Sequence, residues 1–193
     1  MRKSIALAVT ALTTAGLAAF VPTSAFAACT VSCSGDTTVT ATVGTTGVIS
    51  IAVSPTAALA GTSTAATGLL GPTTVTDTQT GTHTWQVAIK STDFTLLNAT
   101  SPTVGAGIIP AGNASVSFSG TGAVAPAPTV AGTATISGYP TTTPLALTTS
   151  NQTLMSASAG NANTVTYTPY MSLSFSSSDP VGVYTGTVTQ TVS

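Results

Sequence analysis

The chain has 193 residues, of which three are Lys or Arg and four are Asp or Glu, so charged residues make up only 4 %. A typical soluble domain has about 25 % charged residues. With so few cations the chain cannot neutralise several phosphates, which excludes nucleic-acid binding. Hydrophobic residues make up 42 %, which is not typical of a disordered chain. Because the remainder is rich in Thr, which suits a pleated and half-buried surface, the composition predicts an extracellular all-β protein.

Residues 1–27 have the pattern of an export signal. Two basic residues follow Met1, an uncharged and mostly apolar stretch comes next, and Ala25-Phe26-Ala27 forms a small-residue cleavage site. Cleavage there leaves one cation, Lys90, and four carboxylates, which gives the mature chain a net charge of −3. No other stretch approaches the roughly 20 apolar residues that a membrane-spanning helix needs. The sequence therefore predicts a secreted protein without a transmembrane span.

The segment 28–45 contains both cysteines, Cys29 and Cys33. In an exported protein an even pair of cysteines indicates a disulfide, which would stiffen only this short segment. Lipidation of Cys29 as the first mature residue is the alternative, because small residues precede it in "FAAC". Two cysteines alone do not form a zinc site, and we expect no cofactor.

Short segments of alternating polarity follow one another from the end of the export signal to the C-terminus. Period-2 alternation predicts strands at the following ranges: 37–43, 47–54, 73–79, 83–91, 114–120, 163–176 (in two registers divided by Pro169) and 183–193. Weaker patterns occupy 132–138 and 143–149, and the Pro/Ala-rich segment 120–135 is predicted to be a long loop. The turn spacing favours one antiparallel β-sandwich of the Ig-like or Greek-key type over residues 46–193.

The stretch 74–95 concentrates the chemically useful side chains, including Asp77, His83, Lys90 and Asp93. One histidine with no nucleophile motif around it, in a chain without Glu, does not support acid–base or nucleophilic catalysis, so no enzyme is predicted. Asp77 and Asp93 are weak candidates for a Ca²⁺ site. The alternative for Asp77 is a cross-strand ion pair with Lys90, worth little if it is exposed.

Two segments resemble the signatures of WxL-domain cell-surface proteins of Gram-positive, in particular high-GC, bacteria. The first is "VTDTQTGTHTWQV", in which Trp85-Gln86-Val87 stands for Trp-x-Leu. The second is "GVYTGTVTQTV", in which Gln190 stands where the family has its second Trp and Val192 where it has Leu. The resemblance covers roughly residues 46–193. It implies non-covalent attachment to the cell wall through both motifs, so the candidate binding residues are Trp85, Val87, Tyr184, Gln190 and Val192.

Trp85 can be interpreted in two ways. Alternation places it on the same face as Val87 and Ile89, which favours a core position, whereas the resemblance allows a ring stacked on a glycan. The sequence therefore predicts a non-enzymatic cell-surface protein that associates with peptidoglycan or with other surface proteins. The alternative is a fimbria-like subunit that assembles by edge-strand pairing, with residues 183–193 as the donor or edge strand.

Overall fold

The structure is a computed structural model that describes residues 34–42, 49–62, 64–97, 99–100, 102–118, 125–159 and 161–193. Within these residues the chain forms strands, one 3-10 turn (η1, Ala111–Asn113) and no α-helix. The prediction of an all-β chain is therefore confirmed. The expected signal peptide, Cys29 and Cys33 lie outside the described residues.

One layer is made of three long strands, each broken once near its middle. Their halves are β2 (Ile49–Val53) and β3 (Thr56–Gly61), β4 (Ala65–Leu69) and β5 (Thr73–Asp77), and β15 (Asn163–Tyr167) and β16 (Tyr170–Ser174). All neighbouring halves pair antiparallel, β2 with β5 and β5 with β15, and β3 with β4 and β4 with β16. A proline lies in each break, where its fixed φ and missing N–H interrupt the ladder.

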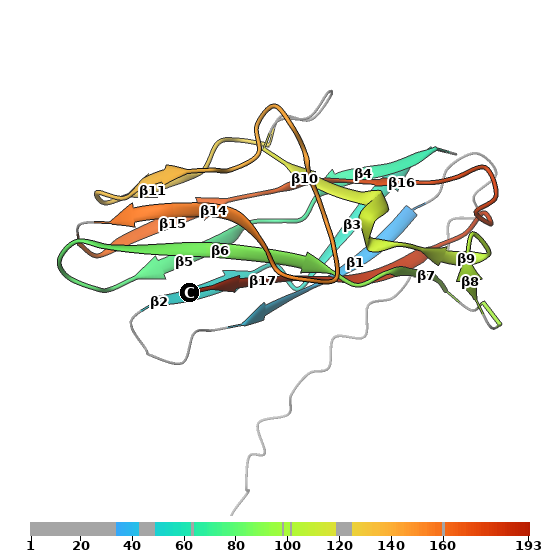
Figure 1. The fold of residues 1–193 in the computed structure, drawn as a ribbon, viewed down its shortest axis with the longest axis horizontal. Coiled ribbons are helices and arrows are strands. Elements are labelled where there is room, and N and C mark those ends of the chain that lie inside the picture. Colours follow the sequence, from blue (N-terminus) through green and yellow to red (C-terminus); the bar gives the residue numbers. More distant parts are fainter. Residues whose placement is uncertain are drawn as a thin grey trace, which may run out of the picture.

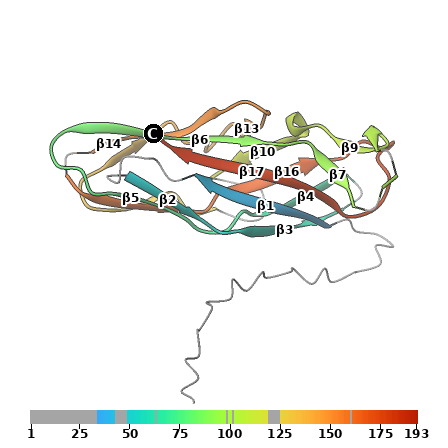
Figure 2. The ribbon, with the colours of Figure 1, turned by 90° about the horizontal axis from the view of Figure 1, so that it is seen from below.

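The other layer has the order β12 (Thr135–Ser137), β14 (Gln152–Ala159), β6 (His83–Ser91) and β17 (Tyr184–Val192). The short strand β7 (Phe94–Leu96) continues β6 beyond Thr92 and Asp93 and also pairs with β17. β9 (Gly107–Ile109) extends this end by pairing with β7, and β8 (Thr103–Val104) pairs with β9. Figure 2 shows β6 and β17 lying over β2, β3 and β5.

Both sides of the molecule link the two layers (Figure 1). On one side β1 (Ser34–Thr42) pairs parallel with β17 and antiparallel with β3. On the other side β10 (Ala114–Ser117) pairs with β16 and with β13 (Leu145–Ala146). The chain just after β13 reaches β6, because the Ser91 N–H donates to the Thr148 carbonyl at 2.9 Å. The larger sheet thus nearly closes around the core.

The C-terminal strand β17 is not an edge, because β1 lies on one side of it and β6 and β7 on the other. The expectation that residues 183–193 act as a donor or edge strand is therefore wrong. In the described part of the chain, β12 and β13 end the order of the larger sheet, and β11 (Thr129–Ala131), which pairs with β15, and β2 end the smaller one. β13 has two residues, β11 and β12 have three and β2 has five, and short edge strands resist pairing with other chains.

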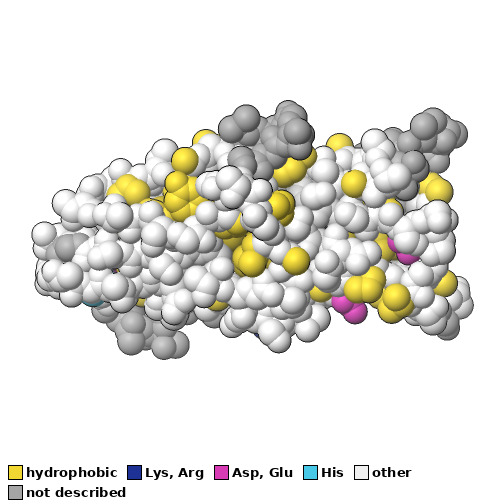
Figure 3. All heavy atoms as spheres, turned by 45° about the horizontal axis from the view of Figure 1, so that its top comes forward, with side chains coloured by type: hydrophobic (Ala, Val, Ile, Leu, Met, Phe, Trp, Pro, Cys, Tyr) yellow, Lys and Arg dark blue, Asp and Glu magenta, His cyan; other side chains and the backbone are white. Residues whose placement is uncertain are grey.

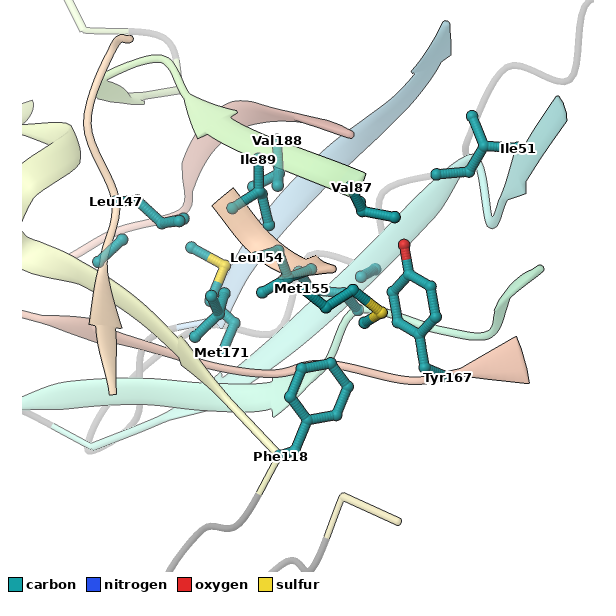
Figure 4. Close-up of a cluster of buried hydrophobic side chains, with 14 of the residues drawn as sticks. Ile51, Val87, Ile89, Phe118, Leu147, Leu154, Met155, Tyr167, Met171 and Val188 are labelled. Atoms are coloured by element: carbon teal, nitrogen blue, oxygen red, sulfur yellow. The ribbon is translucent and has the colours of Figure 1, made fainter. Parts of the chain in front are cut away.

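The core lies between the layers and follows the predicted alternation of β6 (Figure 4). Trp85, Val87 and Ile89 are buried, whereas Gln86 is exposed. Val87, Ile89, Met155 of β14 and, from the opposite layer, Tyr167 belong to one buried cluster. A β-bulge between Thr153 and Met155 lets Leu154 and Met155 both point inward, which strict alternation would forbid.

Candidate functional site

All five residues expected to bind the cell wall lie in the interior. The exposed fractions of Trp85, Val87, Tyr184, Gln190 and Val192 are 3 %, 0 %, 2 %, 0 % and 2 %. Side chains so enclosed offer no surface to a glycan, so the expectation that they contact a ligand is corrected. Of the two interpretations of Trp85, the structure agrees with the core position.

The two segments that carry the family resemblance are neighbours in the sheet. β6 and β17 pair antiparallel, with Val87 opposite Val192 and Ile89 opposite Gln190. Beyond β17 the ladder continues to Gln86, whose N–H donates to the Ser193 carbonyl at 2.9 Å. The signature residues therefore form one inward-facing group that joins the last strand of the chain to the Trp85 strand.

Gln190 is a polar side chain at the centre of the core. Its Oε1 accepts a hydrogen bond of 2.8 Å from the Tyr167 hydroxyl, and its Nε2 donates to the Thr73 Oγ1 at 3.3 Å. Burial raises the pKa of Tyr167, which keeps the phenol protonated and able to donate. This network holds β17 against β5 and β15 of the opposite layer. This network was not predicted from the sequence. The signal was present, because Gln190 is a polar residue at a position where the alternation of the strand predicts a buried side chain.

Tyr184 makes a second polar anchor inside the fold. Its hydroxyl donates to the Pro180 carbonyl at 2.7 Å, and its ring stacks on Phe175 with the centroids 5.9 Å apart. The ring thereby fixes the chain that leads into β17. Its role is in packing, and not in stacking on a saccharide.

Asp77, His83 and Asn163 form a compact cluster where β5 ends and β6 and β15 begin. Oδ2 of Asp77 accepts hydrogen bonds from His83 Nε2 at 2.6 Å and from Asn163 Nδ2 at 2.9 Å. Its Oδ1 accepts the backbone N–H of Gln79 at 3.0 Å, as in an Asx-turn. The predicted ion pair between Asp77 and Lys90 is therefore wrong, because the partner of Asp77 is His83.

Both ring nitrogens of His83 face acceptors. Nε2–H donates to Asp77, and Nδ1–H donates to the Gly81 carbonyl at 2.8 Å. Two acceptor partners require the doubly protonated imidazolium, and the hydrogen bond to Asp77 is the main cause of the raised pKa of His83. Burial alone would raise the pKa of Asp77, but the hydrogen bonds from Gln79, His83 and Asn163 outweigh burial and lower it. An imidazolium held in this way has no lone pair with which to act as a base.

The structure separates the two carboxylates considered for a Ca²⁺ site. Asp77 lies beside the first residue of β6 and Asp93 lies two residues after its last, and a strand of nine residues spans about 25 Å. The expectation of a shared site is therefore wrong. Among the residues that the structure describes, no group of three or more His, Cys, Asp or Glu could hold a metal ion.

The outer face at the junction of β6, β7 and β17 is hollowed between threonines. One hollow of about 210 Å³ and a second of about 480 Å³ share Thr92 and Asp93, so we treat them as one feature, the β6–β7 trough. The trough is lined by the following residues: Lys90, Ser91, Thr92, Asp93, Thr95, Ile108, Thr149, Thr185, Gly186, Thr187 and Thr189. Hydroxyl groups predominate, and the trough holds both Lys90 and a carboxylate.

A third hollow, of about 560 Å³, lies over β12, β14 and the start of β6. Its outer rim carries the hydroxyls of Thr84, Ser137, Ser156 and Ser158. The face drawn in Figure 3 has the same character, with white uncharged surface, scattered apolar groups and very few charged ones. The surface that the described chain offers to a partner is therefore rich in hydroxyls and nearly neutral.

No family model matches this sequence, and a search of curated protein sequences finds no match either. Within the described residues, no helix is long and apolar enough to cross a membrane.

Proposed function

We propose that this chain is an exported, non-enzymatic cell-surface protein that associates non-covalently with the peptidoglycan wall. In this proposal, a cleaved signal peptide precedes one β-sandwich of the WxL type, which comprises β1 (Ser34–Thr42) in addition to the expected range 46–193. The observation that carries the proposal is the pairing of β6 with β17, which brings the two signature segments together in one buried group. Such an arrangement gives both signatures a common role in building the domain.

The outer surface supports hydrogen bonding to the wall polymer. β17 presents the partly exposed Thr185, Thr187, Thr189 and Thr191 in alternation with its buried residues. Each hydroxyl can both donate and accept, so a row of them can exchange hydrogen bonds with the hydroxyls and amides of a polysaccharide. The scarcity of cations argues against electrostatic capture of an anionic wall polymer.

The state of His83 supports the non-enzymatic part of the proposal. A histidine that activates a nucleophile needs one nitrogen free to accept a proton. In this chain both nitrogens donate to fixed acceptors, and His83 is the only histidine. The cluster of Asp77, His83 and Asn163 therefore acts as a structural clamp.

Co-sedimentation with purified Gram-positive sacculi tests the proposal. We expect the purified protein to pellet saturably with increasing amounts of sacculi, without releasing soluble wall fragments. Urea-unfolded protein returned to buffer just before mixing serves as the control for aggregation. A folded protein that stays in the supernatant at every sacculus concentration would contradict the proposal.

Assembly with other surface proteins is the second candidate, and the fold restricts how it could occur. The described edges β11, β12 and β13 have two or three residues, β2 has five, all of them are short for extended strand addition, and β17 is enclosed. We therefore expect size-exclusion chromatography to give one elution volume across protein concentrations. An elution volume that shifts with concentration would favour a self-assembling subunit instead.

A further inference from the structure

We propose that the β6–β7 trough binds the peptide stem of peptidoglycan, with Lys90 taking a carboxylate and Asp93 taking an ammonium group of the stem. This inference rests on the proposed association with the wall and names the site and the part of the polymer that it recognises. The argument starts from the break between β6 and β7.

Thr92 and Asp93 stand out from the sheet because β6 ends at Ser91 and β7 begins at Phe94. Two hydrogen bonds fix Thr92 to Thr187 of β17: its N–H donates to the Thr187 carbonyl at 2.9 Å, and its Oγ1 accepts the Thr187 N–H at 2.9 Å. The same Oγ1 donates to the Asp93 carbonyl at 2.9 Å. The break is therefore a rigid feature that displays two exposed side chains at a constant place.

Asp93 is held by one oxygen and free at the other. Its Oδ1 accepts the Ala111 N–H at 2.8 Å, which orients the carboxylate, whereas Oδ2 has no hydrogen-bond partner among the described residues. The residue is exposed, so Oδ2 is available to a cation from outside. A carboxylate oriented by a backbone donor loses little freedom when it binds a ligand.

Lys90 lies in the same trough without an ion-pair partner in the part of the chain that the structure describes, where the single ion pair joins Asp77 and His83. Lys90 and Asp93 both line the smaller hollow and yet do not approach within 4.0 Å of each other as a salt bridge. Two opposite charges that are held apart in one hollow complement a ligand with opposite charges at a similar spacing. Only 4 % of the residues are charged, and two of them with opposite charge line this one hollow, so we infer a ligand that carries both a positive and a negative group.

The stem peptide of peptidoglycan has this chemistry. A short peptide with a free carboxylate and a diamino residue offers both charges, and its amide groups can bond to the hydroxyls of Thr149, Thr185, Thr187 and Thr189 around them. A chitin-type glycan has hydroxyls and acetamides only and would leave Lys90 and Asp93 unused. The charge pattern therefore favours the peptide over the sugar.

Titration calorimetry with soluble wall fragments tests the site. The probes are a disaccharide-tetrapeptide with a free diamino-residue ammonium, the same tetrapeptide without sugar, and peptide-free chitotetraose. We expect the first two to bind and the third to bind at least tenfold more weakly. Lys90→Gln and Asp93→Asn are each expected to lower the affinity for the tetrapeptide about tenfold, the loss of roughly one charged hydrogen bond. Asp179→Asn, which removes the same charge from another exposed loop, leaves the affinity unchanged, and circular dichroism verifies the fold of each variant.

The outcomes separate this inference from the proposed function. Equal affinity of wild type and both trough variants for the tetrapeptide, or chitotetraose binding as tightly as the disaccharide-tetrapeptide, would overturn the trough as a peptide site. If the wild type nevertheless pelleted with sacculi, wall association would stand and only its location would be wrong. Peptide binding that is lost in both variants, in a protein that does not pellet with sacculi, would support the trough and refute attachment to the intact wall.

Discussion

The ion pair of His83 with Asp77 makes stability depend on pH in two directions. Because the folded-state pKa of Asp77 is lowered, its contribution is present above the unfolded pKa of about 3.9 and is lost as the pH falls through the folded value. Because the folded-state pKa of His83 is raised, its contribution is complete below the unfolded pKa of about 6.5 and is lost as the pH rises through the folded value. We expect the thermal unfolding midpoint to be highest between about pH 4 and 6.5 and to fall on either side.

The variant His83→Gln provides the control. It keeps a side chain that can donate to Asp77 but does not titrate, so the fall of the midpoint above pH 6.5 should disappear while the fall at acid pH remains. A wild-type midpoint that is flat from pH 6 to 9 would show that His83 is not held as an imidazolium.

The buried contact between Tyr167 and Gln190 predicts a non-additive pair of mutations. Tyr167→Phe removes the 2.8 Å hydrogen bond and leaves Oε1 of Gln190 buried without its donor, at a cost of about 1–3 kcal/mol. Gln190→Met removes the acceptor of the Tyr167 hydroxyl and the donor to Thr73 Oγ1, at a similar cost. The double variant should lose less than the sum of the two, because neither partner of the Tyr167–Gln190 hydrogen bond remains without the other. Urea unfolding of the four proteins measures this coupling, and strict additivity would contradict the contact.

Three aligned breaks shape the layer of long strands. Pro55, Pro72 and Pro169 lie in the three breaks, each directly before the first residue of the next strand, and the strands that border the breaks pair with one another. Within the breaks, the Leu70 N–H donates to the Pro169 carbonyl at 2.9 Å. The prolines interrupt the backbone hydrogen bonding at the same height in three neighbouring strands, which divides the layer into two sheets. This division lets one half pair with β1 and β10 while the other half covers β6 and β14.

The packing of β17 against β7 depends on Gly186. A Cβ at this position would lie 2.5 Å from Cδ1 of Phe94, whose ring is buried and cannot move aside. We expect Gly186→Ala to destabilise the protein by about 1–3 kcal/mol through overpacking. Gly112→Ala is the matched control, because nothing lies within 4 Å of its Cβ position, and it should be close to neutral. Equal unfolding midpoints for the two variants would contradict the close approach of β17 and β7.

Strands with clear alternation were predictable from the sequence. β6 occupies the predicted range 83–91 with its predicted buried face, and Pro169 divides 163–176 into β15 and β16 as expected. β3 and β4 escaped prediction because they consist largely of Ala, Gly and Thr, which give little pattern, and β14 because its bulge interrupts the period. β11 lies in the segment that was predicted to be a loop. It is a strand because it pairs with β15, and that pairing could not be predicted from the local sequence.

The candidate sites were less predictable, since they depend on contacts between distant segments. Asn163 approaches Asp77 across 86 residues, and Gln190 reaches Thr73 across 117. Local periodicity carries no information about such pairs. The concentration of Lys90 and Asp93 near the Trp85 strand was visible in the sequence, but their meeting with Thr149 and Thr189 in one hollow required the fold.

At the scale of the whole molecule, the described chain puts its signature residues inside and its hydroxyls outside. In the proposed function, the two WxL-like segments build the two-layer scaffold, and the outer face of β6, β7 and β17 contacts the wall. The position of Gln190 fits this division, because a polar network replaces the expected Trp without changing the outer surface.

Co-sedimentation with sacculi, repeated in the presence of excess soluble disaccharide-tetrapeptide, tests the central claim most directly. The account predicts saturable pelleting that the soluble fragment displaces, because wall association and fragment binding use the same trough. A folded protein that remains in the supernatant with sacculi from several Gram-positive species would contradict wall association altogether.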